Sequence, residues 1–228
     1  MEGKLITFEG IDGVGKTTVS KKVSDRLKEQ GMNIVYINKK DINIYESEYV
    51  RNHMNTIKTV LWDYNPKERL FDLGDNHWLY LNLAWFSTLY DYAIKKELSK
   101  GNLVLTDGWY YKLYSRFVIK GKYAQNVLDD IFFNVPEPDF VYYLNAGFST
   151  ILSRRTEFLP TEFGEMDANK KLLTDKANKF IDYQARVKSV LDSLSEQKGW
   201  EFFLNEQLEE CVNGITTSIL TKFRTKNI

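Results

Sequence analysis

A glycine-rich segment near the N-terminus is the most specific pattern in this chain. Residues 10–17 read GIDGVGKT, so that two glycines enclose four residues and are followed by Lys-Thr. This is the spacing of a P-loop. The segment follows an apolar stretch typical of a buried strand, Lys4–Glu9, and leads into a helical pattern from Thr17. A P-loop joins a strand to a helix in this way, so the context supports the match.

Each part of this segment has a chemical reason. Glycines let backbone N–H groups turn inward and hold phosphate oxygens, and the N-terminus of the following helix adds a partial positive charge. We expect the Lys16 ammonium group to reach the β- and γ-phosphates of ATP, and the Thr17 hydroxyl to bind Mg²⁺. ATP and Mg²⁺ are therefore the predicted cofactors. The residues predicted to hold the phosphates are Gly10, Asp12, Gly13, Val14, Gly15, Lys16, Thr17 and Thr18.

Strand and helix patterns alternate along the rest of the chain, which favours a parallel sheet. We predict an α/β chain with a three-layer P-loop NTPase fold, in which a five-stranded parallel sheet is covered by helices on both faces. The predicted strands are Lys4–Glu9, Asn33–Asn38, Asn102–Asp107, Asp139–Asn145 and Trp200–Leu204. The predicted helices are Thr17–Gln30, Ser47–Trp62, Trp78–Ser99, Tyr123–Phe133, Phe148–Arg155, Ala168–Gln197 and Leu208–Arg224.

The chain is expected to form a single P-loop domain over residues 1–228, because its length suits one large domain and no low-complexity linker divides it. The least regular segment, residues 157–167, contains Pro160 and Gly164. It is either an ordinary loop or part of a lid at about residues 154–168.

Composition narrows the range of partners. The chain has 31 basic and 31 acidic side chains, and a net charge of zero argues against a dedicated nucleic-acid or membrane-surface protein. No signal peptide or long apolar run is visible, so a cytoplasmic protein is expected. The single cysteine, Cys211, excludes an internal disulfide framework.

Two further elements suit phosphoryl transfer. Residues 103–107 read LVLTD, an apolar strand that ends in a carboxylate. In P-loop folds the strand beside the P-loop strand brings such an acid to the Mg²⁺ ion, so Thr17 and Asp107 are the candidate metal ligands. The alternative is that Asp107 caps a helix. Arg154 and Arg155 precede the irregular segment and suit the charge on a transferred phosphoryl group, although they also suit a solvated helix end. The candidate catalytic residues are Lys16, Asp107, Arg154 and Arg155.

Residues 8–18, FEGIDGVGKTT, also resemble the P-loop of the thymidylate kinase family, including its flanking Phe-Glu and its internal Asp. The resemblance covers most of residues 3–195. It implies a homodimeric nucleoside monophosphate kinase that uses ATP and Mg²⁺, with Asp12 near the sugar hydroxyl of the acceptor. Further matches in the order of that family are the strand end at Asp107, residues 138–144, the Arg154-Arg155 pair, Phe180 and Arg186-Val187.

The chain departs from the family pattern on the acceptor side. Where the resemblance implies Asp-Arg-aromatic, this chain has Asp107-Gly108-Trp109, and the acceptor-binding arginine of the preceding helix falls near Phe86. Each lost bidentate contact with a phosphate costs about 1.5–3 kcal/mol unless another cation replaces it. The residues expected to bind the acceptor are Glu9, Asp12, Lys39, Trp85, Phe86, Trp109, Lys112 and Arg116.

Three functions stay open at this point. The main hypothesis is a thymidylate kinase reaction, in which dTMP and ATP give dTDP and ADP. The second is a kinase of the same fold with a changed acceptor, such as a nucleoside, a modified nucleotide or a specialised metabolite, and the missing arginines favour it. The third is a non-catalytic nucleotide-binding module, against which the retention of Lys16, Thr17 and Asp107 argues.

Overall fold

The centre of the molecule is a parallel sheet. The computed structural model describes residues 3–65, 70–155, 157–164 and 173–224. Within them five strands lie in the order β2-β3-β1-β4-β5, and every neighbouring pair is parallel. This confirms the predicted five-stranded parallel sheet. The strands are β1 (Lys4–Glu9), β2 (Ile34–Ile37), β3 (Leu103–Thr106), β4 (Phe140–Asn145) and β5 (Glu201–Leu204).

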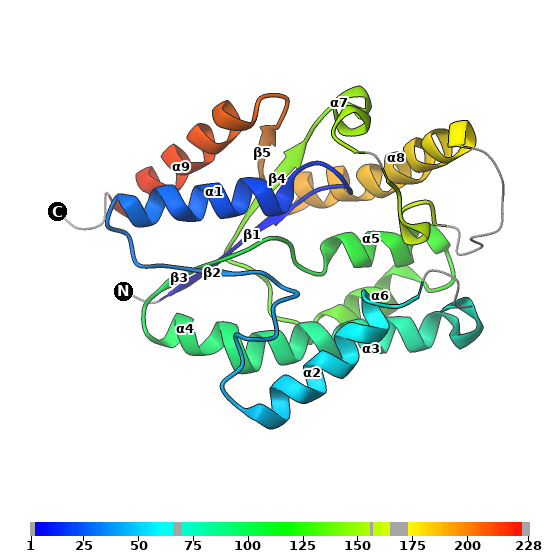
Figure 1. Cartoon of the computed structure of the whole chain (residues 1–228), viewed down its shortest axis with the longest axis horizontal. Helices are drawn as coiled ribbons and strands as arrows, with labels where there is room; N and C mark the ends of the chain where they lie inside the picture. The colour runs from blue at the N-terminus through cyan, green and yellow to red at the C-terminus, as the bar shows by residue number, and fades with distance from the viewer. Residues whose placement is uncertain (1–2, 66–69, 156, 165–172, 225–228) are drawn as a thin grey trace.

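Helices cover both faces of the sheet, as predicted for a three-layer fold (Figure 1). Alternate residues of a strand point to opposite faces, and β4 shows this directly. The hydroxyl of Tyr142 lies 3.1 Å from that of Ser218 in α9 (Leu208–Arg224), whereas the hydroxyl of Tyr143 donates to Asp192 in α8 (Leu173–Lys198). Helices α1 (Lys16–Glu29) and α9 pack together on one face, and α8 and α5 (Tyr111–Lys120) pack together on the other.

The α-helices within the described residues agree with most of the predicted segments. Their bounds are α1 (Lys16–Glu29), α2 (Glu48–Leu61), α3 (Gly74–Leu89), α4 (Lys95–Ser99), α5 (Tyr111–Lys120), α6 (Gln125–Phe132), α7 (Phe148–Ser153), α8 (Leu173–Lys198) and α9 (Leu208–Arg224). Short 3₁₀ turns lie at Leu70–Leu73 (η1) and Pro160–Glu162 (η3), and a π-helical turn at Tyr90–Ile94 (η2) joins α3 to α4. The first residues of the helix predicted from Ala168 lie outside the described residues.

One predicted helix needed correction, and one helix was missed. The helix predicted over 78–99 begins four residues earlier, at Gly74. Its backbone hydrogen bonds change from the α to the π pattern in the turn before α4. Helix α5 was not predicted at all. Its sequence, YKLYSRFVIK, contains aromatic and β-branched residues, which lose side-chain freedom in a helix and so lower its intrinsic helix propensity. Packing against α8 stabilises it as a helix.

The topology places the loops that follow the strands at one edge of the sheet. In a parallel sheet all carboxyl ends point the same way, and ligands bind beyond them. The P-loop follows β1, Lys39 lies just after β2, and Asp107 directly follows β3. Asn205 directly follows β5. The fold therefore brings residues that are distant in the sequence to a common site.

Candidate active site

The P-loop has the backbone that its sequence predicts. Gly10, Gly13 and Gly15 all have positive φ angles, of 146°, 80° and 96°, which glycine adopts without strain. Gly15 caps the N-terminus of α1, and Lys16 is the first helical residue. The Lys16 ammonium group is buried and donates to the carbonyl oxygens of Gly10 and Ile11, each at 2.8 Å. It therefore lies within the turn of the loop, where a bound phosphate would meet it.

The pKa of Lys16 is lowered to about 7. Burial removes water from the ammonium group, and the nearby Lys112 and Lys39 ammonium groups repel it, while Asp12 and Glu9 act in the opposite direction. The negative charges around Lys16 are too few to offset its burial and the repulsion of the two other lysines. The phosphates of ATP carry that charge.

The side chains of Thr17 and Asp107 meet at the end of β3. The Thr17 hydroxyl donates to Asp107 Oδ2 at 2.8 Å, and the other carboxylate oxygen accepts from the backbone N–H of Lys39 at 3.1 Å. Within the described residues no group of three or more His, Cys, Asp or Glu is able to hold a metal ion. One hydroxyl and one carboxylate fit Mg²⁺, which keeps several waters and is held partly by substrate phosphates.

Asp12 of the P-loop is clamped by two basic residues of α5. Lys112 pairs with Asp12 Oδ1, and Arg116 pairs with Oδ2 at 2.7 Å. All three side chains are largely buried. Burial alone would raise the pKa of Asp12, but the Lys112 ammonium and the Arg116 guanidinium outweigh it and hold that pKa well below its usual range. The structure thus brings together three residues that the sequence analysis assigned to the acceptor.

Glu9 lies behind the P-loop, buried from solvent. Its Oε1 accepts from the backbone N–H of Trp109 at 2.6 Å, and its Oε2 has no hydrogen-bond partner among the described residues. Burial raises the pKa of Glu9, against the attraction of Lys39 and Lys16. Glu9 is therefore close to two cations of the site.

Three aromatic residues expected at the acceptor lie in the core instead of along the cavity. Trp85 is fully buried and donates from Nε1 to the Lys39 carbonyl oxygen at 3.0 Å. The rings of Phe86 and Trp109 meet edge-on at 5.2 Å, and Trp109 Nε1 donates to the Pro136 carbonyl oxygen at 2.9 Å. These side chains form the packed layer behind the site, and their assignment as direct ligands stays a prediction.

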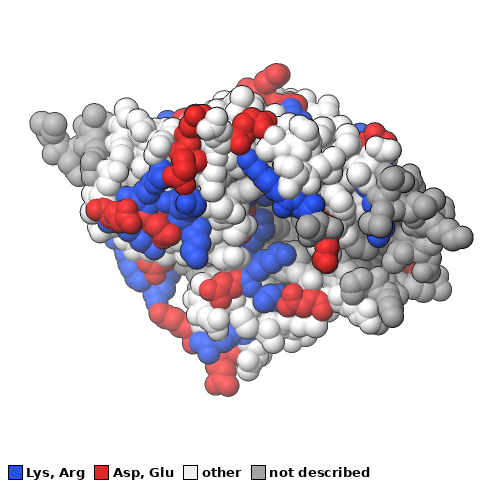
Figure 2. Space-filling view, turned by 45° about the horizontal axis from the view of Figure 1, so that its top comes forward, with Lys and Arg blue, Asp and Glu red and all other residues white. Residues whose placement is uncertain are grey.

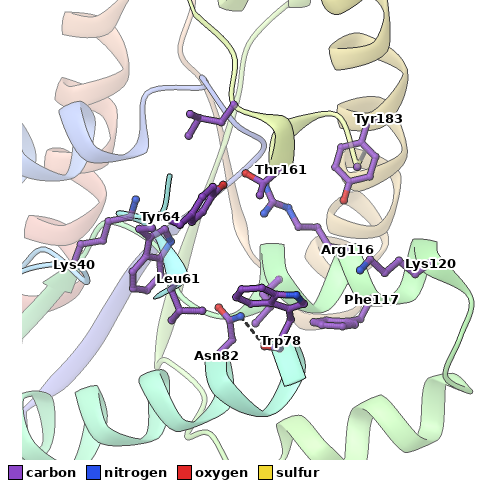
Figure 3. A pocket seen from close by; sticks show the side chains of 14 residues that line it. Lys40, Leu61, Tyr64, Trp78, Asn82, Arg116, Phe117, Lys120, Thr161 and Tyr183 are labelled. Carbon is purple, nitrogen blue, oxygen red and sulfur yellow. Dashed lines mark hydrogen bonds between the residues drawn. The ribbon is translucent and has the colours of Figure 1, made fainter. Parts of the chain in front are cut away.

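A cavity of about 170 Å³ opens beside the Asp12 clamp. Its walls are rich in aromatic side chains, and Arg116 belongs both to the cavity and to the clamp. In Figure 3 Lys40 and Arg116 lie on opposite sides of it, and the amide of Asn82 rises from α3 between Leu61 and Trp78. Most of these residues were missed by the sequence analysis. The aromatic and amide residues of the wall are Trp62, Tyr64, Trp78, Asn82, Phe117 and Tyr183.

The two predicted catalytic arginines take different places. Arg155 contacts the P-loop, because its Cδ lies 2.9 Å from where a Cβ atom on Gly13 would stand. Its Nη2 pairs with both carboxylate oxygens of Glu162, at 2.8 and 2.7 Å, and its buried Nη1 has no partner among the described residues. Arg154 is exposed and donates to the Glu206 carbonyl oxygen at 3.0 Å, in the loop before α9.

The described part of the predicted lid is folded against the P-loop region. Residues 157–164 include the turn η3, and the Leu159 N–H donates to Glu162 Oε2 at 2.9 Å. The guanidinium of Arg155 lies over the rings of Phe158 and Phe180, at 5.2 and 5.3 Å. Thr156 and residues 165–168 of the predicted lid lie outside the described residues.

Basic side chains dominate the site as a whole. Six of them converge between the P-loop, the lid and the cavity, against the four acidic residues Glu9, Asp12, Asp107 and Glu162. Figure 2 shows a hollow near the middle of one face with Lys and Arg side chains gathered around it. Such a site attracts anions. The six basic residues are Lys16, Lys39, Lys40, Lys112, Arg116 and Arg155.

Two buried amide side chains, Asn205 and Gln184, support the P-loop and were not predicted. Asn205 Nδ2 donates to the Val14 carbonyl oxygen at 2.8 Å, and it lies 2.6 Å from where a Cβ atom on Gly15 would stand. Gln184 of α8 contacts Asp12.

None of the described helices is long and apolar enough to cross a membrane.

Known proteins are similar to this chain in sequence and in fold. A probable thymidylate kinase from Sulfurisphaera tokodaii is 25% identical over 198 residues, which are 85% of this chain and 93% of the relative. The thymidylate kinase of Brachyspira hyodysenteriae is 24% identical over 201 residues, 87% of this chain and 89% of the relative. The crystal structure of thymidylate kinase from Ehrlichia chaffeensis has the same fold, with a TM-score of 0.62 at 14% identity, and covers 96% of this chain and 99% of that one.

The family model described as thymidylate kinase matches residues 8–213, nearly the whole length of the chain. The match includes the P-loop, the Thr17–Asp107 pair, the Asp12 clamp and the lid segment. It identifies the protein as a nucleotide kinase, a phosphotransferase with an α/β fold. The chain therefore belongs to the thymidylate kinase family.

Proposed function

We propose that this protein transfers the γ-phosphoryl group of ATP to a nucleoside monophosphate, with thymidylate as the first candidate acceptor. The observation that carries the proposal is the excess of basic side chains between the P-loop and the aromatic cavity. The relatives that bear the name thymidylate kinase support the choice of acceptor.

The charge of the site favours an acceptor that already carries a phosphate. Asp12 neutralises only part of the charge of Lys112 and Arg116, and Lys39 Nζ has no ion pair among the described residues. A half-buried cation such as Lys39 loses part of its hydration, which is costly without an anionic partner. A neutral nucleoside would leave this charge uncompensated, whereas a nucleotide brings its own dianion. Arg116 then connects that phosphate to the cavity that would hold the base.

The cavity suits a flat ring. Aromatic faces such as those of Trp78 and Phe117 stack on nucleobases. Asn82 Nδ2 donates to the Trp78 carbonyl oxygen at 2.7 Å, and no donor to its amide oxygen is present among the described residues. We infer that the edge of the bound ring that faces Asn82 presents an N–H group, as the N3 edge of thymine does.

The mechanism relies on positioning and electrostatics, because phosphoryl transfer needs little covalent help from the protein. Residues 13–18 would hold the phosphates of ATP, and Lys16 would contact the transferred group. Thr17 and Asp107 would hold Mg²⁺, which neutralises charge on the β- and γ-phosphates when bound. From the lid side Arg155 offers its Nη1, which has no partner in the described part of the chain. The folded segment 157–164 limits the access of water to the reacting phosphate.

A changed acceptor is the second candidate, and one observation favours it. The positions at which the resemblance implies two acceptor-binding arginines hold Gly108 and the buried Phe86. The cavity is lined instead by Trp62, Trp78 and Asn82. A modified pyrimidine nucleotide would meet the same cations and a differently shaped base site.

The test is an assay of ADP release with ATP and Mg²⁺ across a panel of nucleosides and nucleoside monophosphates, with Lys16→Ala as the control. Turnover of thymidylate that is lost in Lys16→Ala supports the main proposal. Turnover of a different nucleotide identifies a changed acceptor. Turnover of nucleosides alone contradicts the charge argument, and silence with ATP still bound favours a binding module.

A homodimer and a cytoplasmic location are part of the proposal. Helix α3 buries Leu79, Trp85 and Leu89 yet exposes Tyr80, so it is apolar on more than one side. A helix of this kind is normally covered on all sides, and we propose a second copy of the chain as the cover. Sedimentation of the protein and of Tyr80→Lys tests this: the substitution should shift the dimer toward monomer.

A further inference from the structure

Gln184 of α8 is a polar side chain in the middle of an apolar stripe. The stripe continues through Phe180, Val187 and Leu191, all of which are fully buried. Gln184 is also fully buried, with 0% of its surface exposed. Buried amides are costly unless they are hydrogen-bonded. The partners of this side chain therefore explain its presence.

Those partners belong to two different parts of the active site. The backbone N–H of Asp12 donates to Gln184 Oε1 at 3.0 Å. Gln184 Nε2 donates to Asp12 Oδ2 at 3.2 Å and to the carbonyl oxygen of Glu162 at 3.0 Å. An amide nitrogen has two hydrogens to donate, and both are used. One side chain thus holds the P-loop and the lid segment at the same time.

The network continues from the lid back to the P-loop. The Glu162 carboxylate accepts from Arg155 Nη2 and from the backbone N–H of Leu159. The side chain of Arg155 in turn lies against Gly13. The contacts therefore form a closed circuit that runs from Asp12 through Gln184, Glu162 and Arg155 to Gly13. Networks of buried polar groups of this kind hold their members in one arrangement.

We propose that Gln184 is a positioning residue that couples the P-loop to the lid. Its amide sets the place of Glu162, and thereby of Arg155, according to the place of Asp12. Asp12 is also held by Lys112 and Arg116 on the acceptor side. Arg155 is therefore placed at the phosphates only when these acceptor-side contacts are formed. This last step rests on the proposed function, whereas the coupling of the two segments does not.

Hydrogen–deuterium exchange tests the coupling without any catalysis. Exchange is measured with a non-hydrolysable ATP analogue bound, in peptides that cover residues 8–15 and 157–164. Gln184→Met keeps the size of the side chain and removes all three hydrogen bonds, so exchange should rise about ten-fold in both peptides. Gln184→Asn is the second variant: its amide is one methylene shorter and is unable to reach both partners.

Asn205→Leu is the matched control. Asn205 supports the P-loop through the Val14 carbonyl oxygen, and no contact of its side chain with the lid is present among the described residues. Its replacement should raise exchange in the 8–15 peptide alone. The proposal is overturned if the Gln184 variants leave exchange in 157–164 unchanged. It is equally overturned if exchange rises by the same factor in the β3 peptide, because Gln184 would then support the fold in general.

A second measurement addresses the chemical consequence. The rate of ATP hydrolysis without acceptor is compared with the rate of transfer to the best nucleotide of the panel. Loss of coupling should raise the ratio of hydrolysis to transfer by about ten-fold in Gln184→Met, because the lid no longer follows the P-loop. An unchanged ratio together with equal losses in both rates would contradict the proposal. If no acceptor is found, the proposed function fails while the exchange experiment still decides the coupling.

Discussion

The ammonium group of Lys39 occupies the space in which a Cβ atom on Gly108 would stand. Gly108 directly follows Asp107 and has a φ angle of 144°, which disfavours any side chain. The resemblance to the family implies an arginine at this position. Here the ammonium group of Lys39, which lies just after β2, occupies the place where the arginine side chain after β3 would begin. We propose that Lys39 offsets one of the two arginines that the acceptor side lacks.

Gly108→Ala should displace Lys39 and weaken the acceptor site. We expect kcat/KM to fall about ten-fold or more, a typical effect of losing one charged contact to a phosphate. Backbone strain should also lower the free energy of unfolding by about 1–3 kcal/mol. Steady-state kinetics and urea unfolding measure the two effects. Gly121→Ala is the control, because Gly121 also has a positive φ, of 66°, and no atom of the described residues lies within 4 Å of where its Cβ would stand. It should lose stability and keep its activity.

Asp12→Asn should destabilise the protein by about 3 kcal/mol at pH 7, because Lys112 and Arg116 lose the charge that balances them in a buried setting. The folded pKa of Asp12 lies well below 3.8, the value of the free side chain. Between these two pH values only the unfolded chain binds the proton, so stability falls as the pH falls through that window.

The pH dependence of that variant follows from the same shift. The difference in unfolding free energy between the wild type and Asp12→Asn should grow as the pH falls through about 7, because Asp12 favours the charged form of Lys16 in the folded wild type. It should shrink again below pH 3.8, the pKa of the free side chain. Urea unfolding at a series of pH values measures it. A difference that already disappears near neutral pH would mean that the clamp does not hold the Asp12 pKa down.

Much of this molecule was predictable from the sequence, for a physical reason. A P-loop needs particular residues at a fixed spacing, and strands buried on both faces need short apolar runs, so both leave local patterns. The five parallel strands follow from these patterns, whereas their order in the sheet was not predicted. Asp107 was predicted beside the P-loop because it ends the strand that lies next to β1.

The acceptor side was less predictable, since it is built from side chains far apart in the sequence. Trp85 and Phe86 were expected to contact the acceptor, but an aromatic residue on a helix gives no local sign of whether it lines a cavity or fills the core. The structure places them in the core, and Trp78 and Asn82, one or two turns earlier, line the cavity. Gln184 did carry a signal: a polar residue at the spacing of an apolar helical stripe.

Asn82→Leu should reduce the recognition of the base. If the Asn82 oxygen accepts a ring N–H, the wild type should discriminate against thymidylate methylated at ring N3 by about ten-fold or more in kcat/KM. The leucine variant should lose most of that discrimination, mainly by poorer use of unmodified thymidylate. Competition assays with the two nucleotides measure the ratio. Equal use of both nucleotides by the wild type would exclude this contact.

Thr17→Val should raise the Mg²⁺ concentration needed for half-maximal transfer by about ten-fold. Valine keeps the shape of threonine and lacks the hydroxyl that contacts Asp107, so one oxygen ligand is lost while the carboxylate is retained. Thr17→Ser keeps the hydroxyl and should resemble the wild type. Because Thr17 is exposed, we expect less than about 1 kcal/mol of change in the free energy of unfolding for either variant. Identical Mg²⁺ titrations for the valine and serine variants would contradict the assignment of Thr17 as a metal ligand, and chelation of Mg²⁺ should abolish transfer in all three proteins.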